Sequence, residues 1–175
     1  MIPAAFAYHR PKSIAEAVAL LSDLGEDARP LSGGHSLIPM MKLRLARPSD
    51  LVDLGAIADL KGVREDGPDI VIGATTTQHE VIGSALIAAK APILKEAALV
   101  IADPQVRYLG TIGGNVANGD PGNDMPAVMM CLGATYQLAR KVGERRVAAR
   151  DFYQGAYFTA LEAGEIVTAI RIPAR

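Results

Sequence analysis

Two pairs of consecutive glycines, Gly33-Gly34 and Gly113-Gly114, constrain the fold of this 175-residue chain more than any other feature. They lie in residues 32–36 and 111–115, each between an apolar run and polar or helical residues. Glycine has no Cβ, so the backbone there approaches a phosphate closely and turns successive N–H groups toward it. Either pair alone is also compatible with a plain tight turn. Because hydroxyl and amide side chains flank both pairs, we predict that main-chain N–H groups of the two segments share the pyrophosphate of one dinucleotide.

Composition and charge narrow the class of protein. Half of the residues are apolar, which is enough for one domain or two small packed ones. The formal net charge of −1, with both signs intermixed, argues against a nucleic-acid-binding protein. The single cysteine, Cys131, lies in an apolar stretch and is expected to be a buried thiol in a reducing compartment. With no signal peptide and no run long enough to span a membrane, we expect a soluble, cytoplasmic protein.

Residues 1–54 predict a small layer of alternating helices and strands. Ser13 and Glu16 have the spacing of a capping box, and the apolar residues after them recur at helical intervals up to Gly25. Short strands are expected at 28–31 and 51–54, and a second helix at 37–45. This βαβ-type order places the first glycine segment in a strand-to-helix turn.

From Gly55 onward the pattern changes to an α+β one. A hairpin is expected from 62–65 and 70–74, with helices at 77–86, 92–99 and 125–132. Residues 103–124, which hold the second glycine segment, are predicted to be polar and rich in turns, and strands are predicted at 134–138, 146–149 and 165–172. We therefore predict two packed subdomains, residues 1–54 and 55–175, with a ligand cleft between them.

The sequence offers little support for other site chemistries. Its three histidines and Cys131 are scattered without the spacing of metal ligands, so no metal site is predicted. Ser36 adjoins His35, but sequence neighbours rarely place a nucleophile and its base within reach, and no catalytic residue is predicted. Neither glycine segment matches the P-loop or the Rossmann fingerprint. Asp124 is compatible with an N-cap of the helix that follows and with a ligand contact.

Four stretches carry a resemblance to a known family. They read GGHSLIPMMK at 33–42, IADPQVRY at 101–108, TIGGN at 111–115 and GDPGNDMP at 119–126. Together they resemble the FAD-binding (medium) subunits of molybdenum hydroxylases, the xanthine dehydrogenase family, and most closely those of aerobic carbon monoxide dehydrogenases. The resemblance runs from Tyr8 to Pro173.

This resemblance implies a two-subdomain FAD-binding fold of the PCMH type, α+β in class and rich in antiparallel sheet, with FAD in the cleft. It implies that Asp124 holds a polar group of the FAD, and that Ile101, Ala102 and Val167 line the site. The residues that would hold the pyrophosphate are Ser32, Gly33, Gly34, His35, Ser36 and Leu37 of the first segment and Thr111, Gly114 and Asn115 of the second.

The same resemblance implies a function in electron transfer. The chain would be an oxidoreductase subunit that passes electrons from iron–sulfur clusters through FAD to an external acceptor, while substrate is oxidised on another subunit. Its partners would be an iron–sulfur small subunit and a molybdenum-binding large subunit in a hetero-oligomer, with no nucleic acid and no membrane insertion. Family members continue past the position of Pro173 into a third domain, so we expect this chain to correspond to their first two domains.

Two further interpretations remain open. One is a truncated, flavin-poor assembly module that docks the iron–sulfur subunit. The other is an independent FAD-dependent oxidase, which is less favoured because the sequence shows no substrate base and no site for covalent flavin attachment.

Overall fold

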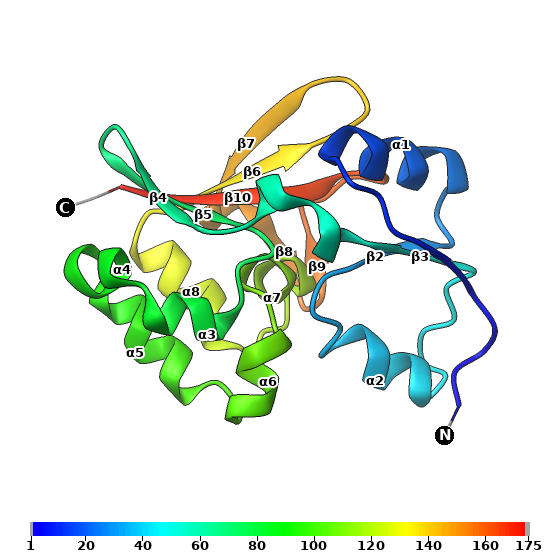
Figure 1. Ribbon diagram of the computed structural model, residues 1–175, viewed down its shortest axis with the longest axis horizontal. Coiled ribbons are helices and arrows are strands. Elements are labelled where there is room, and N and C mark those ends of the chain that lie inside the picture. The colour runs from blue at the N-terminus through cyan, green and yellow to red at the C-terminus, as the bar shows by residue number, and fades with distance from the viewer. Residues whose placement is uncertain (1, 174–175) are drawn as a thin grey trace.

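The computed structural model describes residues 2–173, which form two main β-sheets, a small two-stranded sheet and the helices around them (Figure 1). The smaller sheet is parallel, in the order β1-β3-β2. Its strands alternate with helices along the chain, as predicted. The elements are β1 (Ala7–His9), α1 (Ile14–Leu24), β2 (Ala28–Leu31), α2 (Leu37–Lys42) and β3 (Asp50–Asp53).

Helix α1 forms for the local reasons that the sequence indicates. The Ser13 hydroxyl accepts a hydrogen bond from the N–H of Glu16 and caps the first turn. At the other end, Gly25 adopts a φ of 77° and its N–H bonds back to the carbonyl of Leu21. The apolar face of the helix buries Ala17, Val18 and Leu21.

The larger sheet is antiparallel throughout, in the order β4-β5-β10-β6-β7. Strand β10 lies at its centre, paired with β5 on one side and β6 on the other. The α+β prediction with an antiparallel-rich sheet is confirmed. The strands are β4 (Val63–Asp66), β5 (Asp69–Gly73), β6 (Thr135–Ala139), β7 (Glu144–Ala148) and β10 (Ile166–Pro173).

Six helices lie on one side of this sheet (Figure 1). Their apolar side chains and those of the sheet form the main core, in which Ile72, Leu94 and Ile112 are fully buried. The six are α3 (Gln78–Gly83), α4 (Ala85–Lys90), α5 (Pro92–Val100), α6 (Pro104–Leu109), α7 (Ile112–Asn118) and α8 (Asp124–Cys131). After β7 the sequence did not predict α9 (Ala149–Phe152), β8 (Tyr153–Gly155) or β9 (Phe158–Thr159), all of which are very short.

Several local predictions need correction. The stretch 103–124, predicted to be rich in turns, instead contains α6 and α7, and Gly113 and Gly114 lie in the first turn of α7. The helix predicted at 77–86 is two helices, since Ser84 ends α3 and caps α4 through its side chain. Cys131 is exposed rather than buried, because it is the last residue of α8 and lies on the solvent side.

A second, smaller core joins the two sheets. Val18 and Leu21 of α1 belong to the same buried cluster as Leu54, Ala139 and Ile166. Residues from both sides of position 54 therefore share one apolar interior. The division into subdomains at 54 and 55 remains a prediction.

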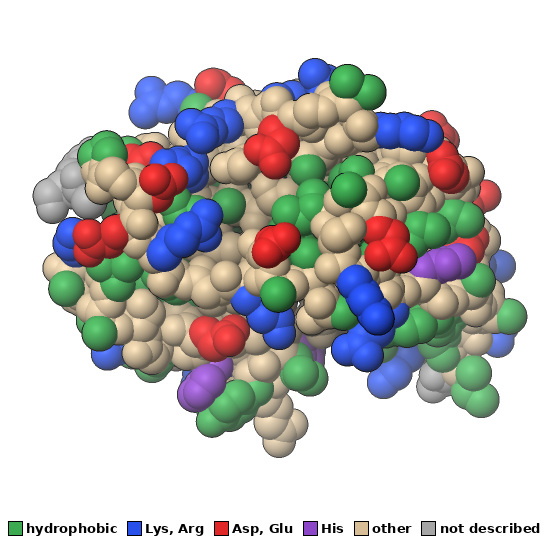
Figure 2. Space-filling model, turned by 45° about the horizontal axis from the view of Figure 1, so that its top comes forward, with side chains coloured by type: hydrophobic (Ala, Val, Ile, Leu, Met, Phe, Trp, Pro, Cys, Tyr) green, Lys and Arg blue, Asp and Glu red, His purple; other side chains and the backbone are tan. Residues whose placement is uncertain are grey.

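The surface shows the mixed charge that the composition indicates. On the face drawn in Figure 2, Lys and Arg side chains are interspersed with Asp and Glu and with apolar groups. Among residues 2–173, none of the helices is long and apolar enough to cross a membrane.

Candidate functional site

A cavity of about 590 Å³ lies where the two glycine segments meet. Its lining comes from the turn between β2 and α2, from the start of α7, and from the first residues of β10. The volume is within the range of about 300–1,000 Å³ that is typical of cofactor and small-molecule sites. The two glycine pairs, separated in sequence, are thus brought to one place.

The first glycine segment presents unengaged main-chain donors. Gly33 and Gly34 have φ values of 72° and 73°, a conformation that favours glycine. None of the hydrogen bonds within residues 2–173 uses the N–H of any residue from Gly33 to Leu37. Such a run of free donors suits an anionic oxygen-rich group.

In the second segment, the main-chain N–H groups of residues 112–115 already have hydrogen-bond partners, which differs from the prediction. The N–H of Ile112 donates to the carbonyl of Thr76, and that of Gly113 donates to the carbonyl of Ala74, both at 2.9 Å. Thr111 caps α7 by accepting from the N–H of Gly114 at 3.1 Å. Main-chain N–H groups of both segments are expected from the sequence to be available to one ligand, but only the first segment has a run of them without partners among the described residues. The reason is that residues 111–115 start a helix whose first donors are already satisfied.

The two segments are in direct contact. The Oγ of Ser32 lies 2.8 Å from the Oγ1 of Thr111, a hydrogen bond across 79 positions of the chain. A Cβ added at Gly33 would come within 2.2 Å of the carbonyl oxygen of Leu109, and one at Gly114 within 3.0 Å of the carbonyl of Ser32. At Gly33 the facing backbone leaves no space for a side chain, and at Gly114 a side chain would force its neighbours to move.

Asn115 supplies an independent indication of a ligand. Its Oδ1 atom is buried and has no hydrogen-bond partner among the described residues, and the residue lines the cavity. Buried polar atoms in native proteins are rarely left unpaired, so an orphan that lines a cavity indicates a missing partner. The same is true of Gln78, which sequence reasoning missed.

Glu165 lines the cavity and forms an ion pair with Arg145. The side chain of Glu165 is 1% exposed and accepts two hydrogen bonds from Arg145, at 2.7 and 2.6 Å. Burial alone would raise the pKa of Glu165, but the bonds from Arg145 and from the N–H of Glu162 hold that pKa below its usual value. Tyr157, which also lines the cavity, has its pKa raised by the charge of the nearby Asp120.

The basic side chains at the cavity are few. Arg29 lines it, but its guanidinium donates to the carbonyls of Glu26 and Ala28. An anionic ligand would therefore be held chiefly by main-chain N–H groups rather than by cations.

Ten of the thirteen residues predicted for the site line this cavity, and three do not. Gly33 belongs to the first segment, but it is outside the cavity lining and faces the carbonyl of Leu109. Ala102 and Asp124 are outside the lining, and Asn123, not Asp124, caps α8. The ten are Ser32, Gly34, His35, Ser36, Leu37, Ile101, Thr111, Gly114, Asn115 and Val167.

Several residues line the cavity but were not predicted from the sequence. Most of them belong to no recognisable sequence motif. Asn118, Asp120 and Asn123 are exceptions, because they belong to a polar stretch whose composition was a usable signal. The remaining ones include Ala74, Gln78, Tyr157 and Glu165.

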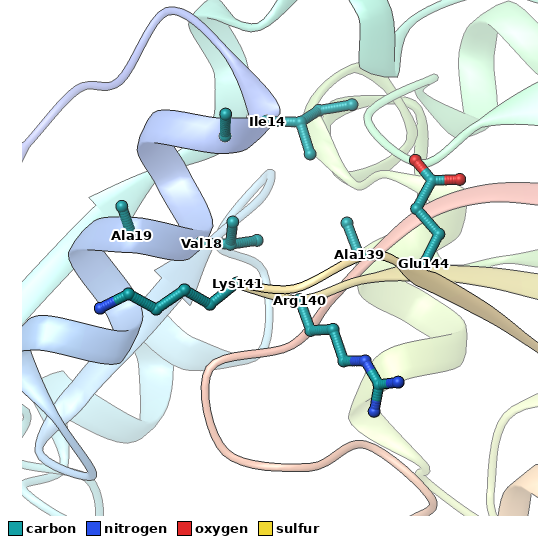
Figure 3. Close-up of a pocket in the computed structure, with 9 residues that line it drawn as sticks. Ile14, Val18, Ala19, Ala139, Arg140, Lys141 and Glu144 are labelled. Atoms are coloured by element: carbon teal, nitrogen blue, oxygen red, sulfur yellow. The ribbon is translucent and has the colours of Figure 1, made fainter.

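A second hollow, of about 360 Å³, lies between α1 and the hairpin of β6 and β7 (Figure 3). Ile14 and Val18 face Ala139 across it, while Arg140 extends away from them (Figure 3). Lys141 is paired with Asp23 at 2.8 Å. None of the predicted site residues lines this hollow, and it holds none of the orphaned polar atoms described above.

Comparison with known families decides what kind of domain this is. Residues 4–175 match the family described as the FAD binding domain in molybdopterin dehydrogenase. The chain belongs to this family. FAD is thus the cofactor of this FAD-binding domain, and the resemblance seen in the four motifs is confirmed.

The FAD-binding domain is similar to several curated proteins. It is 71% identical over 173 residues to the carbon monoxide dehydrogenase medium chain of Afipia carboxidovorans, covering 99% of this chain and 60% of that one. It is 52% identical over 174 residues to the carbon monoxide dehydrogenase medium chain of Hydrogenophaga pseudoflava, covering 99% and 61%. The chain thus spans about 60% of the length of these relatives.

Solved structures agree with this assignment. A chain of the reconstituted carbon monoxide dehydrogenase from Oligotropha carboxidovorans superposes with a TM-score of 0.99 at 70% identity, covering all of this chain and 61% of that one. A chain of quinoline 2-oxidoreductase from Pseudomonas putida 86 superposes with a TM-score of 0.96 at 39% identity, with the same coverage.

Proposed function

We propose that this FAD-binding domain holds FAD in the cavity between the two glycine segments and works in electron transfer within a carbon monoxide dehydrogenase-like molybdenum hydroxylase. The observation that carries the proposal is the run of free N–H groups from Gly33 to Leu37, next to the orphaned Asn115 Oδ1. Family membership supports the choice of FAD over other anionic ligands.

In this proposal the first segment holds the pyrophosphate. Its N–H groups donate to the phosphate oxygens, and the two glycines allow the phosphates to approach the backbone. Ser32 and Thr111 fix the distance between the segments through their 2.8 Å hydrogen bond.

The second segment works through side chains and shape. Asn115 contributes its amide, which turns about its last side-chain bond to offer either oxygen or nitrogen. Gly114 allows the second segment to approach the carbonyl of Ser32 with no side chain between them. Ile101 and Val167 provide apolar lining, as the resemblance implies, and Ala102 and Asp124 stay part of the proposed site although they are outside the cavity lining.

Bound FAD would supply the redox chemistry, accepting electrons from iron–sulfur clusters and passing them to an external acceptor. The chain's own residues bind the cofactor, orient it and limit the access of water. The partners proposed are an iron–sulfur small subunit and a molybdenum-binding large subunit, which fits the names of the similar medium chains.

The test is whether the purified 175-residue chain binds FAD. Binding is measured by equilibrium dialysis and by the quenching of flavin fluorescence. One FAD per chain is expected. No bound flavin at excess FAD would overturn the proposal.

A matched pair of variants ties binding to the cavity. Gly114→Ala places a Cβ 2.8 Å from the Oγ1 of Thr111, whereas Gly83→Ala meets nothing within 4 Å. Gly114→Ala is expected to weaken FAD binding by about tenfold or more, and Gly83→Ala to leave it unchanged. Docking of an iron–sulfur subunit with equal strength to both variants, and without FAD in either, would favour the assembly-module interpretation instead.

A further inference from the structure

Gln78 is a buried amide without a partner. It is the first residue of α3 and is 2% exposed. Its Oε1 and Nε2 atoms are both buried, and neither has a hydrogen-bond partner within residues 2–173. The residue lines the same cavity as the two glycine segments. Because native proteins rarely bury a complete amide unpaired, both atoms need partners that the described part of the chain does not provide.

The backbone around Gln78 is fixed to the second glycine segment. Its N–H donates to the carbonyl of Gly110 at 2.9 Å, and the neighbouring Thr77 forms a β-bridge with Thr111. A capping box of Thr77 and Glu80 also fixes the start of α3. The start of α3 is therefore fixed beside the cavity. Because the helix is fixed, it cannot shift to bring the amide of Gln78 to another partner.

The chemistry of the amide restricts what it binds. Its oxygen accepts and its nitrogen donates, so a partner must carry a donor and an acceptor side by side. Phosphate oxygens only accept and would leave Oε1 unpaired. The edge of a heteroaromatic ring, with an N–H or amino group beside a ring nitrogen or carbonyl, satisfies both atoms.

The lining near Gln78 suits a flat ring. Gly110, which accepts the N–H of Gln78, donates its own N–H to the carbonyl of Val106 at 2.7 Å. Val106 and Ile101 both line the cavity with apolar side chains. These apolar side chains offer a surface for the face of a ring, which leaves the polar edge of the ring for an amide in the same cavity.

We propose that Gln78 binds, through its side-chain amide, the donor–acceptor edge of one ring of the cofactor, an inference that rests on the proposed FAD site. Two rings of FAD carry such an edge, the adenine and the pyrimidine part of the isoalloxazine. Gln78 is thus a binding and positioning residue in addition to the two glycine segments.

The experiment compares Gln78→Leu with Gln105→Leu, a control on the exposed surface of α6. Leucine keeps most of the volume of glutamine and removes the unpaired polar atoms. In the absence of cofactor, Gln78→Leu is therefore expected to raise the melting temperature of the chain. Its affinity for FAD is expected to fall by about tenfold. If Gln78 had only a structural role, its replacement would lower both the melting temperature and the affinity for FAD. A rise in one and a fall in the other therefore indicates a role in binding.

Two fragments of FAD identify the ring. If adenine is the partner, Gln78→Leu weakens binding of ADP but not of riboflavin 5′-phosphate; if the isoalloxazine is the partner, the reverse holds and the visible flavin band shifts. Unchanged FAD affinity in Gln78→Leu, or a lowered melting temperature without cofactor, would overturn the inference. Failure of the wild-type chain to bind FAD would instead overturn the proposed function, so the two failures are distinct.

Discussion

The hydroxyl oxygens of Ser32 and Thr111 lie 2.8 Å apart, although 79 positions separate the residues in the chain. Ser32 follows β2 in the parallel sheet, while Thr111 caps α7 beneath the antiparallel one. This contact lies where the two walls of the cavity meet. Its strength can be measured directly.

A double-mutant cycle on Ser32 and Thr111 tests that contact. Thr111→Val removes both the cap of α7 and the hydroxyl pair, so it is expected to lower the free energy of unfolding by about 1–2 kcal/mol. Ser32→Ala removes only the pair. Urea unfolding of both single variants and the double variant should give a coupling free energy of about 1 kcal/mol, and strict additivity would contradict the contact.

Gly33→Ala tests the close approach of the first segment to Leu109. Alanine at a φ of 72° costs about 1 kcal/mol for its conformation alone, and the added Cβ would lie 2.2 Å from a carbonyl oxygen. We expect a total loss of about 2–4 kcal/mol in unfolding free energy. Gly67→Ala is the matched control, because it shares the positive φ but meets nothing within 4 Å. Equal losses for the two variants would show that the close approach is unimportant.

Glu165→Gln tests the ion pair beside the cavity. Removing the charge leaves Arg145 without its buried partner and is expected to cost about 2 kcal/mol near neutral pH, less than for a fully buried pair because the Arg145 side chain is 27% exposed. The control is Glu162→Gln, whose side chain is 64% exposed and which should cost about 0.5 kcal/mol or less.

The effect of Glu165 has a defined pH dependence. The pKa of Glu165 is lower in the folded chain than in the unfolded one, so its stabilisation is present above the ordinary carboxylate pKa and is lost as pH falls through the folded value. Urea unfolding between about pH 7 and about pH 3 should therefore show the gap between wild type and Glu165→Gln narrowing in acid. A constant gap would contradict the lowered pKa.

Cys131 is expected to react with thiol reagents in the native chain. It is exposed and is the single cysteine of the sequence. A disulfide reagent should modify one thiol per chain without denaturant, and Cys131→Ser should abolish the reaction. Modification that requires denaturant would instead agree with the burial that the sequence suggested.

The sequence predicts this fold well where local signals determine structure. The cap at Ser13, the end of α1 at Gly25 and the turn between β2 and α2 all follow from short-range chemistry, and all are present. The second glycine pair is mispredicted, because glycine is needed there for tertiary packing rather than for a turn. A Cβ at Gly113 would lie 2.5 Å from that of Ala74, so this glycine allows α7 to pack against the end of β5. Helix propensity alone opposes such a pair.

The candidate site is predictable only in part for the same reason. The motifs locate both walls of the cavity, and ten of the thirteen predicted site residues line it. Gln78 has no motif of its own, because its significance lies in the absence of a partner once the chain is folded. Which N–H groups of the second segment are already engaged also depends on contacts with residues 74 and 76, far away in sequence.

The apolar cluster shared by α1, Ala139 and Ile166 has a mechanical consequence. Swinging the parallel sheet away from the antiparallel one would expose Val18 and Leu21 to water, so the cleft resists hinge-like opening. We therefore expect a ligand to enter and leave the cavity without separation of the two sheets.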